Sequence, residues 1–181
     1  MASPNYQSAL IVGAGRGLSA SLARLFAGEG LCVALAARDI EKLAPLCSET
    51  GAKAFACDAV QPDQVARLFT AVEAASGAPD VVVYNASARA RGPVAELVPA
   101  EVERAIMVSA FGGFLVAREA ASRMVPKGHG AIRNPGRVEP PDRPDSMLDP
   151  DAIAASYLGV LHQPRSAWTW EVELRPWVER F

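Results

Sequence analysis

A glycine-rich turn, Gly13-Ala14-Gly15-Arg16-Gly17, is the stretch of this 181-residue sequence with the clearest chemical meaning. An apolar run, Ala9–Val12, leads into it, and a helical pattern with leucines on one face follows it as far as Phe26. Glycines let a backbone pass close to a diphosphate, and the helix that follows offers N–H groups and the positive end of its dipole. The strand–turn–helix context therefore predicts a phosphate-binding turn.

Two arginines near this turn could bind a further phosphate. Arg16 lies inside the turn, and Arg38 follows the second apolar run. Guanidinium groups bind phosphates bidentately, whereas an NAD-type site places an acidic side chain at the end of the second strand for the ribose hydroxyls. That place is taken by Ala37, so Arg38 favours NADP(H) over NAD(H), and the alternative is that both arginines are solvated surface residues. Asp39 is interpreted as a helix cap.

Strands and helices that alternate along the chain would position these residues. Strands are expected at 9–12, 31–37, 53–57 and 81–84, and helices at 18–26, 39–50, 61–76 and 99–124. This alternation predicts an α/β fold, a doubly wound parallel sheet of the Rossmann type, with the strands ordered 3-2-1-4 by right-handed crossovers.

The pattern changes after this first part. A fifth strand could begin at Ala131-Ile132, but residues 133–150 form a proline-rich loop, which excludes a central strand there. A helix starting near Asp149 and a last strand at 167–174 follow it. The C-terminal half of the sheet is therefore expected to be incomplete.

The composition bounds the remaining possibilities. The length suits one domain, 1–181, and a net charge of −2 gives no reason to expect nucleic acid or an anionic membrane as partner. Cys32, Cys47 and Cys57 lack metal-ligand spacing, so no metal site is predicted, and free thiols suit the cytosol. The sequence has no leader pattern, and we expect a cytoplasmic protein that does not enter a membrane.

Residues 1–125 resemble the short-chain dehydrogenase/reductase family. Gly13 and Gly17 match the family's opening motif, and Ser19 replaces its last glycine. Asp58, after the third strand, matches the acidic residue that the family places beside the adenine ring. The resemblance implies a Rossmann fold that binds a nicotinamide dinucleotide. It also implies that Arg16, just before Gly17, lies near the same 2′ position as Arg38, where two guanidinium groups suit the phosphate of NADP(H).

Two further segments carry the resemblance. Tyr84-Asn85-Ala86-Ser87 is similar to the family's Asn-Asn-Ala-Gly, and residues 165–170 resemble the final strand region of bacterial members. The residues that the resemblance and the glycine-rich turn assign to the cofactor are Gly13, Gly15, Arg16, Gly17, Leu18, Arg38, Asp58, Ala59, Asn85, Ala86 and Ser87.

The family's proton-transfer residues are missing. Members of the family use a Tyr, a Lys four residues later, a Ser upstream and an Asn on the long helix, and the cation lowers the pKa of the phenol. None of the tyrosines at positions 6, 84 and 157 is followed by a lysine four residues later, and Ser109 stands where the Asn would be. No catalytic residue is therefore assigned.

The break after Ile132 suggests the cause. About one strand–helix–strand unit, of about 30 residues, is absent between Ile132 and Arg133. The chain resembles an internally shortened family member or a sequence that has lost its middle. The last strand would then lack its neighbour, so the protein is expected either to be less stable than the full family domain or to depend on self-association into a homo-oligomer.

These observations give three hypotheses for the function. The first is an NADP(H)-dependent oxidoreductase for a small carbonyl or alcohol substrate, by resemblance, with turnover lost or impaired. The second is a catalytically inactive nucleotide-binding or interaction protein, and the third is a deletion product with no selected role. Arg89 and Arg91 could meet an acidic substrate or be ordinary surface charges.

Overall fold

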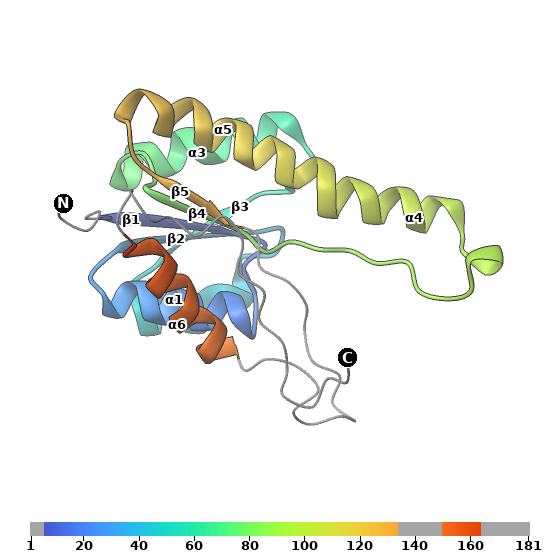
Figure 1. The fold of residues 1–181 in the computed structure, drawn as a ribbon, viewed down its shortest axis with the longest axis horizontal. Coiled ribbons are helices and arrows are strands. Elements are labelled where there is room, and N and C mark those ends of the chain that lie inside the picture. Colours follow the sequence, from blue (N-terminus) through green and yellow to red (C-terminus); the bar gives the residue numbers. More distant parts are fainter. Residues whose placement is uncertain (1–5, 134–149, 164–181) are drawn as a thin grey trace.

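Five parallel strands in the order β3-β2-β1-β4-β5 form the sheet at the centre of the protein (Figure 1). The computed structural model describes residues 6–133 and 150–163. The strands are β1 (Ser8–Val12), β2 (Cys32–Ala37), β3 (Lys53–Ala56), β4 (Val81–Tyr84) and β5 (Ala131–Arg133). The predicted order 3-2-1-4 is confirmed, and the short fifth strand extends the sheet beside β4.

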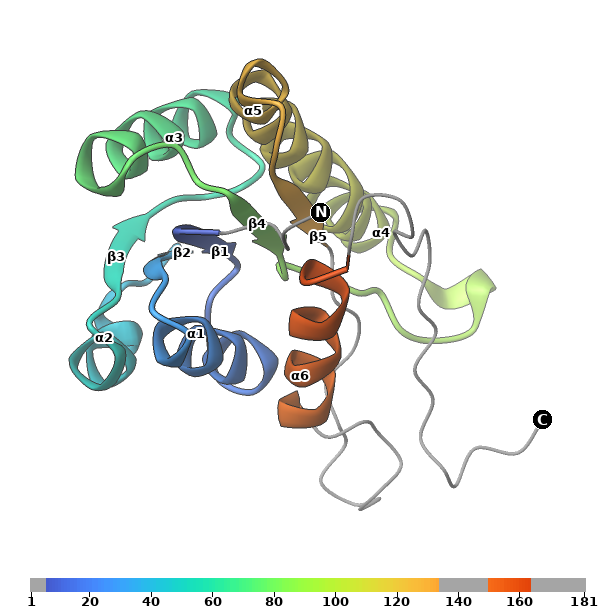
Figure 2. The same ribbon diagram turned by 60° about the vertical axis from the view of Figure 1, so that its left-hand side comes forward.

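The helices divide between the two faces of the sheet (Figure 2). They are α1 (Leu18–Gly28), α2 (Ala44–Thr50), α3 (Pro62–Ser76), α4 (Pro99–Ile106), α5 (Gly112–Lys127) and α6 (Pro150–Leu161). α1, α2 and α6 cover one face, and α3 and α5 cover the other. The described chain is therefore a three-layer α/β arrangement, as the alternating pattern predicts.

The strands are apolar along their whole length because both faces are covered. In β1, Ile11 packs with α1 and α6, whereas its neighbours Leu10 and Val12 pack with α3 and α5. Successive side chains of a strand point to opposite faces, so the continuous run supplies both cores. β1 lies between β2 and β4, and Leu10 is in register with Ala34 on one side and Val82 on the other.

Two helical segments differ from the prediction. The helix expected from Asp39 starts as a 3₁₀ turn, η1 (Glu41–Leu43), and continues as α2. The helix expected over 99–124 is interrupted by a π-helical segment, η3 (Met107–Phe111), between α4 and α5. The connection between β4 and α4, residues 85–98, contains a short 3₁₀ turn, η2 (Val94–Glu96).

The helix expected after residue 149 is confirmed as α6. Ala154 and Leu161 are buried, and Ile153 and Tyr157 pack against the core beside α1. The proline-rich stretch that follows β5, within the predicted loop 133–150, and the predicted strand 167–174 lie outside the described residues.

One helical run is long and apolar. Pro99–Lys127 spans 29 residues with a mean hydropathy of 1.3 in its most apolar window, of which 22% is buried. By length and composition alone it could cross a membrane, but core helices of soluble proteins pass the same test. The absence of a membrane partner stays a prediction.

Candidate functional site

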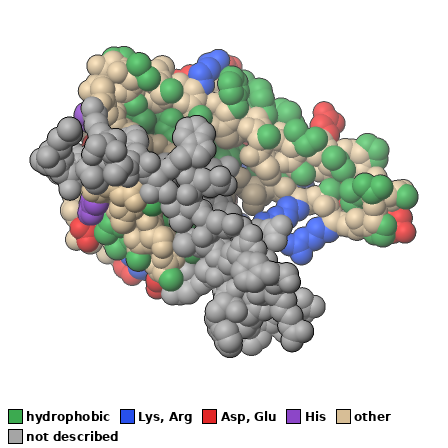
Figure 3. All heavy atoms as spheres, in the orientation of Figure 1, with side chains coloured by type: hydrophobic (Ala, Val, Ile, Leu, Met, Phe, Trp, Pro, Cys, Tyr) green, Lys and Arg blue, Asp and Glu red, His purple; other side chains and the backbone are tan. Residues whose placement is uncertain are grey.

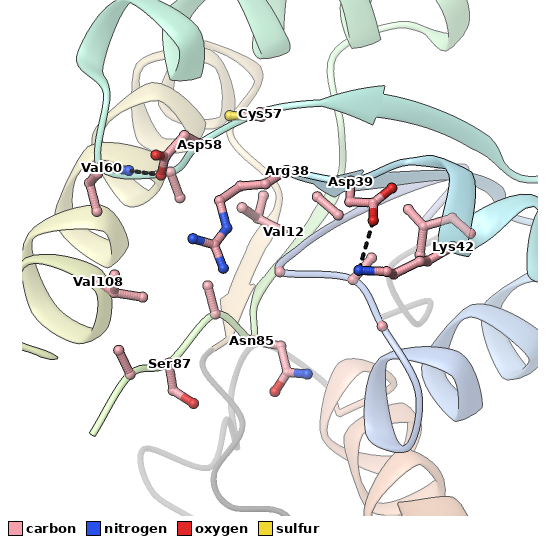
Figure 4. Close-up of a pocket in the computed structure, with 18 of the residues that line it drawn as sticks. Val12, Arg38, Asp39, Lys42, Cys57, Asp58, Val60, Asn85, Ser87 and Val108 are labelled. Atoms are coloured by element: carbon pink, nitrogen blue, oxygen red, sulfur yellow. Dashed lines mark hydrogen bonds and ion pairs between the residues drawn. The ribbon is translucent and has the colours of Figure 1, made fainter. Parts of the chain in front are cut away.

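A cavity of about 720 Å³ opens at the carboxyl ends of the strands (Figure 4). Its wall is built by residues that follow β1, β2, β3 and β4, together with one face of α4 and η3. The chain leaves β1 towards β2 and returns to β4 on the other side, so the strand order reverses here. Such switch points leave a crevice in which open α/β sheets bind ligands.

The cavity gathers most of the predicted site residues. Those that line it are Gly13, Gly15, Arg16, Arg38, Asp58, Ala59, Asn85, Ala86 and Ser87. Gly17 and Leu18 lie just behind them at the start of α1, where Gly17 is the N-cap and the side chain of Leu18 enters the core. Arg89 and Arg91 are exposed and do not line this cavity.

Gly13 is fixed by the protein itself. Its φ is +82°, and a Cβ atom there would lie 2.3 Å from the backbone nitrogen of Ala86. The N–H groups of Gly13 and Ala14 both donate to the carbonyl of Ala36 at 2.9 Å. The turn is therefore held between the ends of β2 and β4, and only glycine allows this close approach.

Gly15 and Gly17 face open space. No heavy atom lies within 4 Å of a Cβ placed on either residue, and only Gly17 has a positive φ, +74°. No side chain caps α1 at this end. The first N–H groups of a helix need a partner, so this end of α1 and the open side of Gly15 can receive an anion.

Ser19 connects the turn to the strand beside it. Its hydroxyl donates to the carbonyl of Gly13 at 3.3 Å and accepts from the amide of Asn85 at 2.5 Å, and the side chain is buried. Ser19 thus replaces a family glycine with a hydrogen-bonded link. The bond from its amide to Ser19 holds Asn85, which lines the cavity, in position.

Two arginines line the cavity, Arg16 from the turn after β1 and Arg38 from the end of β2. Neither forms an ion pair with another residue of the ranges 6–133 and 150–163. Figure 4 shows the guanidinium group of Arg38 pointing into the cavity. Both groups are therefore available to an anionic ligand.

Asp39 and Lys42 form a pair at the same rim. The carboxylate of Asp39 accepts from the N–H of Glu41 at 3.2 Å and lies 2.7 Å from the ammonium of Lys42. The Lys42 hydrogen bond holds the pKa of Asp39 below its usual value. The prediction that Asp39 caps the helix is wrong, because Ile40 is the N-cap of η1, and Asp39 instead forms an Asx-turn just before it.

Asp58 shapes the far wall. Its carboxylate accepts from the N–H of Val60 at 3.3 Å, and its own N–H donates to the side chain of Gln64 at 2.8 Å. Burial, and to a lesser degree the charge of Asp58, raises the pKa of the neighbouring Cys57 thiol to about 11. A thiol in this state is not a nucleophile at neutral pH.

Tyr84 is used in packing, not in proton transfer. Its hydroxyl donates to the carbonyl of Val108 in η3. Burial raises its pKa to about 12. Val108 lies in the π-helical segment between α4 and α5, so this bond joins β4 to the interruption of the helix.

Ser109 anchors the same π segment to the loop after β4. Its hydroxyl donates to the carbonyl of Ala88 at 3.0 Å and accepts from the N–H of Ala88 at 3.1 Å. The residue that replaces the family's Asn is therefore a structural connection. Within the described ranges, no group of three or more His, Cys, Asp or Glu residues could hold a metal ion.

Sequence reasoning missed some residues of the cavity. Lys42, Arg104 and Val108 line it, although none belongs to a motif. The four-residue spacing of Arg104 and Val108 is the signal that could have placed both on one helix face. Lys42 could have been found from its position three residues after Asp39.

A family model described as short chain dehydrogenase matches residues 7–134. The chain belongs to the short-chain dehydrogenase family. A short-chain type dehydrogenase/reductase of Picea abies is 34% identical over 140 residues, which cover 70% of this chain and 52% of the relative. The chain spans about half the length of the curated relatives it matches.

Solved structures of the family share the fold. A short-chain dehydrogenase from Rhodopseudomonas palustris is 27% identical with a TM-score of 0.81, over 96% of this chain and 100% of the other. A metagenomic short-chain oxidoreductase in complex with NADP has the same identity, 27%, and TM-score, 0.81, over 96% of this chain and 98% of the other. The predicted family and the Rossmann-like sheet are confirmed.

Proposed function

We propose that the cavity binds NADP(H). The observation that carries this proposal is the open side of Gly15 in the turn between β1 and α1, beside the uncapped end of that helix. The protein gives no steric reason for glycine at this position, whereas a diphosphate that approaches the backbone would. A related oxidoreductase that has been solved with NADP supports the same assignment.

The other predicted residues would contact different parts of the dinucleotide. Arg16 and Arg38, which have no acidic partner in the described chain, would bind the 2′-phosphate that distinguishes NADP(H). Asp58 and Ala59 would lie beside the adenine. Asn85, Ala86 and Ser87 would line the path towards the nicotinamide, and Gly13, Gly17 and Leu18 would shape the turn. We propose that residues 1–181 serve as one NADP-binding domain.

By resemblance to the family, the reaction would be hydride transfer between NADP(H) and a small carbonyl or alcohol. When bound, the nicotinamide supplies or accepts the hydride. The substrate oxygen also needs a proton donor with a matched pKa. The sequence has no Tyr-x-x-x-Lys, and the hydroxyl of Tyr84 is buried and bonded to the chain. We therefore expect binding without normal turnover, which is the behaviour of a catalytically inactive nucleotide-binding or interaction protein.

Calorimetric titration with NADPH and NADH, followed by an assay of NADPH oxidation with a panel of aldehydes and ketones, tests the proposal. We expect saturable binding that is tighter for NADPH, and no oxidation. Arg38→Ala should weaken NADPH binding by about tenfold and leave NADH binding unchanged. If neither dinucleotide binds, the proposed function is wrong, and robust turnover would refute the loss of catalysis.

A further inference from the structure

A carboxylate stands where the proposed phosphate subsite should be basic. Asp39 follows Arg38 directly and lines the same cavity. An unpaired carboxylate near the end of β2 would repel a 2′-phosphate and attract ribose hydroxyls, so it would favour NAD(H). The preference for NADP(H) therefore depends on what happens to the charge of Asp39.

Both oxygens of this carboxylate are engaged. Oδ1 accepts from the backbone N–H of Glu41 at 3.2 Å, and Oδ2 lies 2.7 Å from Nζ of Lys42. Lys42 is three residues after Asp39 in the sequence, and the 3₁₀ turn η1 brings its side chain back to the carboxylate. Figure 4 shows the pair at the rim of the cavity, apart from Arg38, whose side chain points inward.

We propose that Lys42 determines the cofactor preference of this cavity by pairing with Asp39 and neutralising the one carboxylate that follows Arg38. This inference rests on the proposed NADP(H) site. Lys42 acts as a specificity-determining residue through Asp39, and contact with the phosphate is not required. With the pair intact, the rim presents Arg16 and Arg38 to a 2′-phosphate, and the other carboxylates that line the cavity are those of Glu41, which is exposed, and of Asp58 on the far wall.

The test is a double-mutant cycle on the full chain, read as Kd for NADPH and for NADH by calorimetry. Lys42→Ala should weaken NADPH binding about 3- to 10-fold, because the pair is exposed and partly screened, and should change NADH binding less than twofold. Asp39→Asn keeps an acceptor for the N–H of Glu41 and should bind NADPH at least as tightly as the wild type. The double variant Asp39→Asn/Lys42→Ala should return NADPH affinity to near the wild-type value.

Lys53→Ala is the matched control, because Lys53 is an exposed lysine that bonds to the carbonyl of Ala75 and does not line the cavity. It should leave both affinities unchanged. If the double variant stays as weak as Lys42→Ala, Lys42 acts on the phosphate directly and the inference is wrong. An unchanged NADPH affinity in Lys42→Ala would overturn it as well. Failure of the wild type to bind either dinucleotide would instead refute the proposed function itself.

Discussion

Gly13 and Gly15 occupy the same turn for different reasons. A side chain on Gly13 would overlap the backbone of Ala86, whereas a side chain on Gly15 would meet no protein atom within 4 Å. Gly13 is therefore required for packing of the turn against β4, whereas the open space at Gly15 belongs to the proposed ligand site. Substitution to alanine separates the two roles at the smallest possible change in volume.

We expect Gly13→Ala to lower the free energy of unfolding by about 2–4 kcal/mol, because the turn and the end of β4 must move apart and the positive φ is strained. Gly15→Ala should unfold like the wild type and bind NADPH at least about tenfold more weakly. Urea denaturation and calorimetry measure the two effects. A Gly15→Ala protein with unchanged NADPH affinity would contradict the role assigned to this glycine.

How far the sequence predicts the site depends on the residue. The glycine-rich turn, Arg16 and Arg38 could be placed because they directly follow strands, and the carboxyl ends of parallel strands meet at one edge. Spacing could pair Lys42 with Asp39 and place Arg104 on a helix face, but it could not place either residue at the cavity, because their positions depend on the start of η1 and on where α4 crosses the cavity. Their sequence spacing is compatible with many surface positions.

At the scale of elements, the long helix is shaped by what it touches. Strand and helix positions up to β4 could be predicted from hydrophobic spacing, since each element is apolar on the faces that it buries. The π segment η3 could not, because it forms where Val108 accepts a bond from Tyr84 and where Ser109 bonds to Ala88. These contacts join residues that are distant in sequence.

Gly112 is the close contact between this helix and β4. A Cβ atom there would lie 2.4 Å from the hydroxyl of Tyr84 and 3.1 Å from the carbonyl of Ala59. Gly112→Ala should therefore destabilise the protein by about 1–3 kcal/mol, as overpacking does. Gly113→Ala is the control, since its nearest contact is an ordinary 3.4 Å.

Urea denaturation followed by far-UV circular dichroism compares the two variants. Gly113→Ala should be as stable as the wild type or slightly more stable, because alanine favours the helix. Equal loss of stability in both variants would show that the helix tolerates no added methyl group. The specific contact with Tyr84 would then not be the cause.

At the scale of the whole molecule, α4, η3 and α5 leave an apolar surface uncovered. Ile106 and Phe114 are each 58% exposed, and Ala110 between them is exposed as well. Figure 3 shows hydrophobic side chains gathered along the part of the molecule formed by α4, η3 and α5. Exposed apolar surface of this kind marks an interaction site.

We propose that a second copy of the chain covers this surface. If two helices pair in antiparallel fashion about Ala110, Ile106 of one copy meets Phe114 of the other. The same arrangement brings Glu103 near the exposed Arg118, so charges of opposite sign face each other. Such a two-fold contact is self-complementary and closes as a dimer.

We therefore predict a homodimer in solution, measured by size-exclusion chromatography with light scattering. Phe114→Glu should shift it to the monomer, because the variant places a charge on the apolar contact. Ile40→Glu makes the same change at a partly exposed residue away from this helix and should remain dimeric. A wild-type monomer at all concentrations, or a Phe114→Glu variant that stays dimeric, would exclude this surface as the interface.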